Sequence, residues 1–132
     1  MVLVDTSVWI EILRDRSGAR RRALLEALDG EDLFLSRFTQ LELLQGSRDE
    51  GEWQLLSSYL ADQDYLELSE GSWEGAARIY FDLRRAGLTV RSPIDCCIAQ
   101  LALDRDALLI HRDRDFETIA RSRPLRQIRV AW

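Results

Sequence analysis

Short apolar segments that alternate with amphipathic stretches constrain the fold of this chain more than any other feature of its sequence. These segments cover residues 2–4, 33–35, 65–68, 107–110 and 128–130. Between them, apolar residues recur at the spacing of one helix face. Strands that alternate with helices form a parallel sheet covered on both faces. We therefore expect an α/β fold, in which a mainly parallel sheet of four to five strands is flanked by helices.

Helix boundaries are predicted from residues that favour the two ends of a helix. Ser17 is expected to cap a helix that stops at Gly30, and Thr39 to open one that ends at Gly46. Proline is favoured at the first helical position, so Ser92-Pro93 predicts the start of another helix. Further helices are expected near residues 9–13, 53–60, 72–86 and 116–120.

The composition indicates one domain, residues 1–132, that does not enter a membrane. The chain is 46% hydrophobic and 31% charged, and no apolar run approaches the ~18 residues of a membrane span. The sequence meets an aspartate directly after Val4, without the basic start of a secretory signal, so we expect a cytoplasmic protein. Cys96 and Cys97 are adjacent, which disfavours a disulfide, and we expect both to be small buried residues.

The charge of the chain limits the kinds of partner that it can bind. A net charge of −5 argues against broad, non-specific binding to nucleic acid. Clustered acids that hold cations would account for part of this excess, so the charge does not exclude a nuclease. Lysine is absent, and all 18 basic residues are arginines, whose forked guanidinium suits phosphate contacts.

Acidic side chains fall where the predicted strands end and the predicted helices begin. Asp5 follows the first strand, and Asp113 and Asp115 follow the fourth. Glu42 and Asp95 lie in the first turns of two predicted helices. Ligands of such sheets bind at the carboxyl ends of the strands, so we expect these acids to converge at one edge of the sheet.

Each acid also has a purely structural interpretation. Glu42 could complete a capping box with Thr39, and Asp95 could stabilise a helix N-terminus through the helix dipole. The two aspartates after the fourth strand could be turn residues on an exposed loop. Asp5 is harder to explain in this way, because a carboxylate that ends an apolar, central strand is costly without a partner.

Taken together, the acids predict a metal site. Two carboxylates about 5 Å apart repel by roughly 3 kcal/mol at an effective dielectric near 20, so several cannot all stay ionised without a cation or protons. Oxygen ligands without histidine or cysteine suit Mg²⁺ or Mn²⁺. Such ions polarise a phosphate, activate water and stabilise the leaving oxygen.

Several other enzyme classes are disfavoured by what the sequence lacks. The single histidine excludes a two-histidine ribonuclease mechanism, and there is no nucleophile elbow, P-loop or G-x-G-x-x-G turn. His111 is expected to pack or hydrogen-bond at the end of a strand. A phosphatase with an aspartyl nucleophile usually has D-x-D after its first strand, whereas Thr6-Ser7 follows Asp5 here. A signalling receiver domain relies on a lysine, and this chain has none.

The acidic segments resemble the motifs of the PIN-domain nucleases, and specifically those of the toxins of VapBC-type toxin–antitoxin modules. The resemblance covers essentially the whole chain, and its strength lies in the order and spacing of the motifs. They are Val4-Asp5-Thr6-Ser7-Val8-Trp9-Ile10, Thr39-Gln40-Leu41-Glu42-Leu43-Leu44-Gln45-Gly46, Pro93-Ile94-Asp95 with Ile98-Ala99, and Asp113-Arg114-Asp115-Phe116.

Carried over by position, the resemblance implies which residues form the site. The acidic centre would consist of Asp5, Glu42, Asp95 and Asp113, of which all but the glutamate would bind the metal. Asp115 is implied as an accessory acid. Thr6 or Ser7 is implied as a hydrogen-bond partner of the first aspartate or of a metal-bound water. The chain departs from the pattern at His111, where many relatives have threonine or serine.

The resemblance also implies a fold, an activity and partners. The fold would be the PIN three-layer sandwich, and the activity a ribonuclease dependent on Mg²⁺ or Mn²⁺. The partners would be RNA, a cognate antitoxin and a second copy of the chain. Exposed apolar residues on the helices at 39–61 would form a docking surface, although we expect Trp53 to belong to the core. Two alternatives stay open: an inactive PIN-like binding module and a metal-dependent phosphatase.

Overall fold

The computed structural model describes residues 1–132 and contains one sheet of four parallel strands. The strands are β1 (Val2–Val4), β2 (Leu33–Phe34), β3 (Leu108–His111) and β4 (Gln127–Arg129). They lie in the order β2-β1-β3-β4, so β1 and β3, far apart in the sequence, pair at the centre. Because all the strands run in the same direction, their carboxyl ends meet at one edge. The mainly parallel α/β sheet predicted from the sequence is confirmed.

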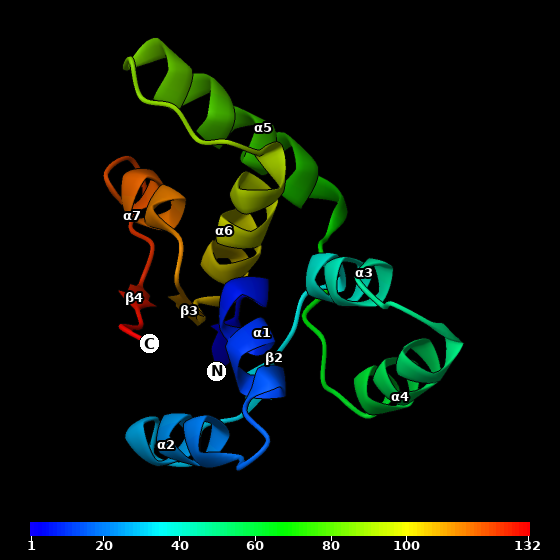
Figure 1. Ribbon diagram of the computed structural model, residues 1–132. Helices are drawn as coiled ribbons and strands as arrows, with labels where there is room; N and C mark the ends of the chain where they lie inside the picture. The colour runs from blue at the N-terminus through cyan, green and yellow to red at the C-terminus, as the bar shows by residue number, and fades with distance from the viewer.

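Seven helices surround the sheet (Figure 1). They are α1 (Thr6–Arg14), α2 (Ala19–Ala27), α3 (Arg37–Gln45), α4 (Glu50–Ala61), α5 (Glu70–Arg85), α6 (Pro93–Arg105) and α7 (Arg114–Ala120). The longest, α5, packs along α6 and ends in a turn where Gly87 adopts a φ of +77°. None of the helices combines the length and the apolarity that crossing a bilayer would require.

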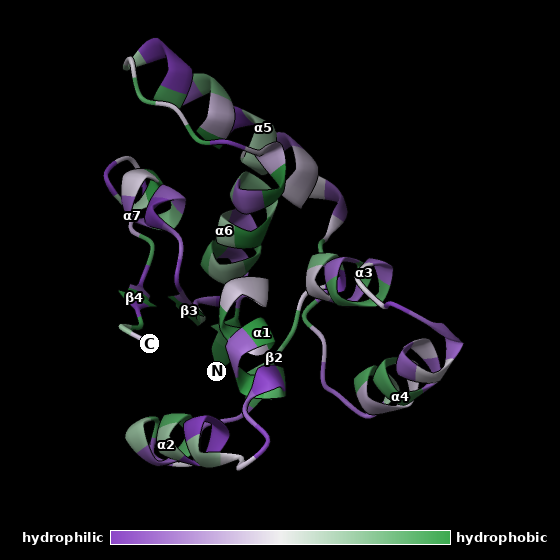
Figure 2. Ribbon diagram, viewed as in Figure 1, coloured by the Kyte–Doolittle hydropathy of each residue, from purple (hydrophilic) through white to green (hydrophobic).

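The alternation of side chains along the central strands divides the apolar core into two layers. Leu3 and Leu109 face one side of the sheet and pack with buried residues of α5, α6 and α7. Val4 and Ile110 face the other side and pack with buried residues of α1, α2, α3 and α4. The molecule is therefore a three-layer sandwich, with helices on both faces of the sheet. Figure 2 shows β1 and β3 in the green of apolar residues, whereas the chain between β3 and α7 is purple.

Cys96 and Cys97 lie near the start of α6. Both are buried in the first of these two layers, and neither forms a disulfide. Their predicted role as small core residues is confirmed. Burial raises the pKa of the Cys96 thiol to about 11, so this side chain stays protonated at neutral pH.

The segment 65–68 does not form the strand that its alternation predicted. Only Tyr65 makes a bridge, to Leu35, through hydrogen bonds from the Leu35 N–H to the Asp64 carbonyl and from the Leu66 N–H to the Leu35 carbonyl, and the main chain then leaves the sheet. The segment is followed directly by the next helix, because Ser69 already caps α5, so no further residues are left to extend the strand.

Two helix starts also differ from the prediction. Helix α3 begins at Arg37 rather than at Thr39, because the Ser36 hydroxyl accepts the Thr39 N–H and caps the helix earlier. Helix α2 has Gly18 as its N-cap, with a φ of +73°, and the Ser17 hydroxyl accepts the Ala19 N–H beside it.

Trp53 is not a core residue, contrary to the sequence prediction. Its exposed fraction is 42%, and it lies on α4, which buries Leu60 as its one fully enclosed side chain. A short amphipathic helix at the edge of the molecule has only one buried stripe, and Trp53 falls outside it. The exposed apolar surface on α3 and α4 therefore includes Leu41, Trp53 and Leu55.

Candidate active site

Asp5 lies at the carboxyl end of β1 and caps helix α1. Its Oδ2 accepts hydrogen bonds from the Ser7 N–H, at 3.1 Å, and from the Ser7 hydroxyl, at 2.6 Å. The same hydroxyl accepts the N–H of Arg112, at 2.9 Å, so Ser7 ties the end of β1 to the end of β3. Asp5 is only 7% exposed. This burial raises its pKa, although the hydrogen bonds from Ser7 act in the opposite direction.

Glu42 reaches the same edge from the second turn of α3. The Thr6 hydroxyl, which follows Asp5 in the chain, donates to Glu42 Oε1 at 3.0 Å and lies 2.9 Å from the Thr39 hydroxyl. Partial burial raises the pKa of Glu42, and the charge of Asp5 adds to this effect. The predicted first-turn position of Glu42 was wrong, and so was the capping box, because Ser36 caps α3.

Asp95 occupies the first turn of α6, as the sequence predicted. Ser92 caps this helix by accepting the Ile94 N–H at 3.1 Å, and Pro93 is its first residue. The surroundings of Asp95 raise the pKa of its carboxylate to about 7. Burial contributes most to this shift, followed by the charges of Asp113, Asp5 and Asp115.

Asp113 and Asp115 lie at the start of α7, just beyond β3. Asp113 caps the helix, with its Oδ1 accepting the N–H of Asp115 at 3.0 Å. The backbone N–H of Asp113 donates to Nδ1 of His111 at 3.0 Å, and Nε2 of His111 lies 2.6 Å from Gln127 Oε1. Since Nδ1 accepts a hydrogen bond, Nε2 carries the proton and donates it to Gln127. His111 is fully buried and holds the turn that presents Asp113, in agreement with its predicted place at a strand end.

The acids form one group with a tight centre. Carboxylate oxygens of Asp95, Asp113 and Asp115 lie within 4.8 Å of one another. Glu42, Asp95 and Asp113 line a hollow of about 230 Å³ together with Arg91, Ser92 and Ile94. Asp5 lies outside the tightest trio, but its charge contributes to the raised pKa values of Glu42 and Asp95. The structure thus brings all the predicted acids to one edge and places Asp115, predicted as accessory, inside the trio.

The helix ends at this edge favour negative charge. Asp5 and Asp113 are the N-caps of α1 and α7, and Asp95 lies in the first turn of α6. The N-terminus of a helix carries a partial positive charge, which offsets part of the repulsion between the carboxylates. The structural and chemical roles considered for these residues are therefore compatible, because one carboxylate can cap a helix and still face the hollow.

Arg91 is a member of this site that the sequence reasoning missed. Its Nη2 donates to Asp113 Oδ2 at 2.8 Å, and its Nε donates to Asp115 Oδ2 at 3.2 Å. Its backbone N–H also donates to Asp115 Oδ2, at 3.1 Å. The side chain is nonetheless 79% exposed. Its position directly before Ser92-Pro93 was the only available signal, since a helix start that presents an acid also brings the preceding residue to the same edge.

The donor set fits a hard divalent cation. Every side chain of the trio offers carboxylate oxygen, the single imidazole is turned away towards Gln127, and the buried Cys96 thiol is protonated. Mg²⁺ and similar ions prefer such oxygen ligands, whereas Zn²⁺ usually takes nitrogen or sulfur. A cation would also relieve the repulsion from the neighbouring aspartates, which adds to the effect of burial on the pKa of Asp95.

Comparison with known proteins places the chain in a family. A family model of the PIN domain matches residues 2–122. Ribonuclease VapC11 of Mycobacterium tuberculosis is 36% identical over 126 residues, which cover 92% of each chain. Ribonuclease VapC51 of the same organism is 30% identical over 118 residues, covering 89% of this chain and 84% of the relative.

A solved structure supports the same assignment at the level of the fold. In the crystal structure of VapBC2 from Rickettsia felis bound to a promoter DNA fragment, the matching chain superposes with a TM-score of 0.80. The match covers 99% of this chain and 100% of that one, at 17% sequence identity. By sequence and by fold, the chain belongs to the PIN-domain family.

Proposed function

We propose that this protein is a metal-dependent endoribonuclease that acts as the toxin of a toxin–antitoxin pair in the cytoplasm. One observation carries the proposal: carboxylates from separate parts of the chain converge at one edge of the sheet, in a family whose relatives here are named ribonucleases. Such a cluster is costly to build and is matched to a divalent cation.

The residues have distinct roles in this proposal. Asp5, Asp95 and Asp113 bind the cation, Mg²⁺ or Mn²⁺, and Glu42 completes the acidic centre. Asp115 assists as an accessory acid. Ser7 orients Asp5, and Thr6 orients Glu42, through the hydrogen bonds described above. When bound, the cation polarises the scissile phosphate and lowers the pKa of a water molecule.

A cleavage assay tests this proposal. Purified protein is incubated with structured RNA in Mg²⁺ or Mn²⁺, and in parallel with EDTA or with the Asp5→Asn variant. We expect cutting that requires the metal and that the variant loses while its circular dichroism stays unchanged. Equal cutting by the variant would contradict the assignment of Asp5. Sequencing of RNA ends after induced expression would identify the target.

Two alternatives give different results in the same assay. An inactive PIN-like module would bind RNA or protein without cutting under any metal condition. A metal-dependent phosphatase would release phosphate from small phosphomonoesters. Retention of all four acids at the predicted edge favours the nuclease over the inactive module.

The partner proposals rest on exposed apolar side chains. Leu41, Trp53 and Leu55 lie exposed on α3 and α4, and single large apolar patches on a soluble surface often mark interaction sites. We propose that a cognate antitoxin binds this chain and blocks the acidic pocket, and that the chain forms homodimers. Size-exclusion chromatography with light scattering, with and without a co-expressed candidate antitoxin, tests both. A monomer that is never inhibited would contradict them.

A further inference from the structure

Three neighbouring hollows, each sharing lining residues with the next, lead away from the acidic site. The acid-lined hollow shares Arg91 and Asp113 with a second hollow of about 460 Å³. The second shares Arg112 and Arg129 with a third, of about 350 Å³, which ends at Trp132. We call this path the arginine groove. It runs from the carboxylates, past the start of α7, to the C-terminal residues after β4.

The middle of the groove is strongly basic, although the chain as a whole is acidic. Its seven lining residues include no hydrophobic side chain, and they are Arg91, Arg112, Asp113, Arg114, Asp115, Thr118 and Arg129. Four of the seven are arginines, in a chain with a net charge of −5. The two aspartates are those that a cation would neutralise. With the metal site filled, the groove would therefore present almost only positive charge.

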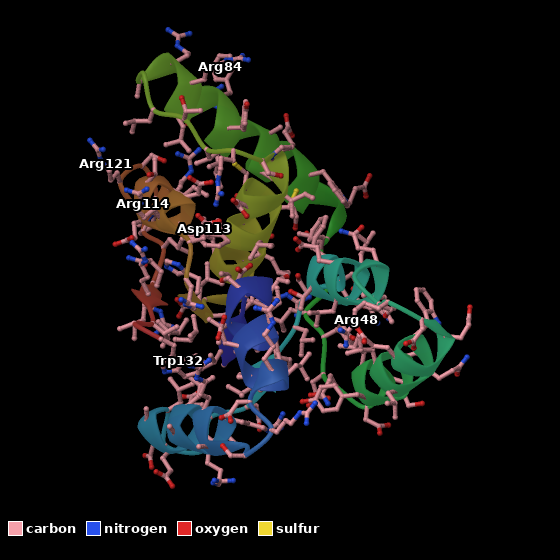
Figure 3. The ribbon with its side chains drawn as sticks, viewed as in Figure 1. Arg48, Arg84, Asp113, Arg114, Arg121 and Trp132 are labelled. Atoms are coloured by element: carbon pink, nitrogen blue, oxygen red, sulfur yellow. The ribbon has the colours of Figure 1, made fainter.

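The arginines differ in whether they already form an ion pair with an acidic side chain. Arg112 pairs with Glu11 at 3.0 Å, and Arg129 pairs with Glu117 at 3.1 Å. Arg114, in the first turn of α7, is exposed and lies within 4.0 Å of no carboxylate. Figure 3 shows Arg114 beside Asp113, whereas Arg84 lies at the far end of α5 and Arg48 lies by the α3–α4 connection. Arg129 is exposed, and an exposed arginine with a weak surface partner can exchange that partner for phosphate at little cost, whereas Arg112 is half-buried.

The far end of the groove offers an aromatic ring. Trp132 packs at the margin of the apolar layer on the α1 side, and the Arg20 guanidinium lies 5.6 Å from its ring centroid. A partly exposed indole next to a row of arginines is the combination that single-stranded nucleic acids recognise, since bases stack on the ring while phosphates follow the positive charge.

We propose that single-stranded RNA binds along the arginine groove, with phosphates on Arg112, Arg114 and Arg129 and a base stacked on Trp132. This inference rests on the proposed nuclease function and adds the path of the substrate. A strand held in this way places one phosphodiester at the acids and extends from there over α7 and β4. The local groove, rather than the overall charge, then explains how an acidic protein binds RNA.

The test measures RNA binding without cleavage. A fluorescent, unstructured RNA is titrated with protein in EDTA, and the dissociation constant is obtained from anisotropy at several salt concentrations. The test variant is the double substitution Arg114→Gln with Arg129→Gln. The control is Arg48→Gln with Arg84→Gln, which makes the same change of charge. Each pair removes one arginine without an acidic partner and one that pairs with a surface glutamate, since Arg48 pairs with Glu52.

We expect the groove variant to bind RNA about tenfold more weakly and to lower the salt slope of log K by about 1.4, roughly 0.7 for each lost phosphate contact. The control should stay within about twofold of the wild type. Equal weakening of both variants would overturn the proposal, because it would indicate binding through net charge alone. Thermal melts of both variants verify that the fold is intact.

A second pair of variants tests the stacking position. Trp132→Ala should weaken RNA binding by about tenfold with an unchanged salt slope, because stacking releases no counterions. Trp73→Ala, at an exposed tryptophan on α5, should have no effect. Unchanged binding by Trp132→Ala would overturn the stacking position.

The two proposals fail in different ways. If the protein cuts RNA with metal but the arginine substitutions do not change its RNA affinity, the groove proposal is refuted and the nuclease proposal is not. If the groove substitutions weaken RNA binding as expected but the protein cuts no RNA in Mg²⁺ or Mn²⁺, the nuclease proposal is refuted and the groove proposal is not.

Discussion

The acidic site has two halves that are stabilised by different means. In the first half, Asp5 and Glu42 are held by hydroxyl groups, those of Ser7 and Thr6. In the second half, the trio of Asp95, Asp113 and Asp115 is held on its outer side by the exposed Arg91. Asp5, in the hydroxyl-held half, is the most deeply buried of the acids, and the arginine-held half is the more crowded with charge.

The difference shows how the chain tolerates so many carboxylates before a cation binds. Neutral hydroxyls orient the first pair without competing for a metal ion. Arg91 supplies an exposed positive charge beside the trio, and an exposed side chain can leave when a cation arrives. The first half is therefore expected to be preformed, and the second half to respond to metal.

The largest expected effect separates two members of the trio. Asp113 lines both the acid-lined hollow and the middle hollow of the arginine groove, whereas Asp115 lines only the middle one. Asp113→Asn should lower the rate of RNA cleavage by about 10³-fold, which corresponds to several kcal/mol of lost stabilisation by the metal ion. Asp115→Asn should lower it about tenfold. Single-turnover rates measure both, and equal losses would show that the trio acts as one unit.

The pH dependence of stability tests how strongly the carboxylates of the arginine-held half repel one another. The pKa of Asp95 is about 7 in the folded protein and near 3.8 for an unperturbed aspartate, so between these pH values the folded state holds a proton that unfolding releases. Metal-free stability should therefore fall as the pH rises from about 4 to 7, and level off above this. The shift corresponds to about 4 kcal/mol for a fully buried group, and solvent screening reduces the expected change to about 2 kcal/mol.

Asp95→Asn should remove this contribution and stabilise the metal-free protein at neutral pH. Chemical denaturation in EDTA between pH 4 and 8 measures the change. Asp106→Asn, at the other end of α6, is the control and should leave the pH profile as it is. A large loss of stability in Asp95→Asn would instead indicate that this carboxylate serves mainly the helix start.

The hydroxyl-held half can be tested against a nearly identical motif on the surface. Ser17 bonds to Asp15 through its N–H and hydroxyl, at 3.2 and 2.6 Å, just as Ser7 bonds to Asp5. Ser7→Ala should lower the free energy of unfolding by about 1.5 kcal/mol. It removes a hydrogen bond from the buried Asp5 carboxylate and leaves the Arg112 N–H without its acceptor. The free-energy cost of Ser17→Ala should be only a few tenths of the cost of Ser7→Ala, because water replaces the lost hydrogen bonds at the surface. Urea denaturation compares the two, and equal costs would mean that burial does not distinguish them.

The smallest expected effect concerns metal affinity. Arg91→Gln removes a positive charge beside the trio, so it should tighten Mn²⁺ binding by about tenfold while lowering the melting temperature of the metal-free protein. Isothermal titration calorimetry and thermal melts measure the two quantities. Arg129 lines the same hollow as Arg91 but pairs with Glu117, so Arg129→Gln should change neither the Mn²⁺ affinity nor the melting temperature. Weaker metal binding by Arg91→Gln would show that this arginine supports the cation rather than competing with it.

Most of the local structure could be read from the sequence because it depends on neighbouring residues. The strand Val2–Val4 is apolar throughout, so it had to be buried, and Ser92-Pro93 fixes a helix start within a few residues. Predictions failed where local signals competed. Thr39 and Ser36 are both possible caps, and the segment at 65–68 alternates like a strand but has only Leu35 beside it.

The sequence by itself determined the two-sided apolar core, the order of strands and helices along the chain, and the identity of the candidate acids. Only the tertiary structure decided how these acids meet, because the parallel pairing of β1 with β3 aligns strand ends that are about a hundred residues apart in the chain. The ion pairs of Arg91 and the arginine groove arise in the same way. Side-chain contacts between distant segments follow from strand register, and no local pattern of residues encodes that register.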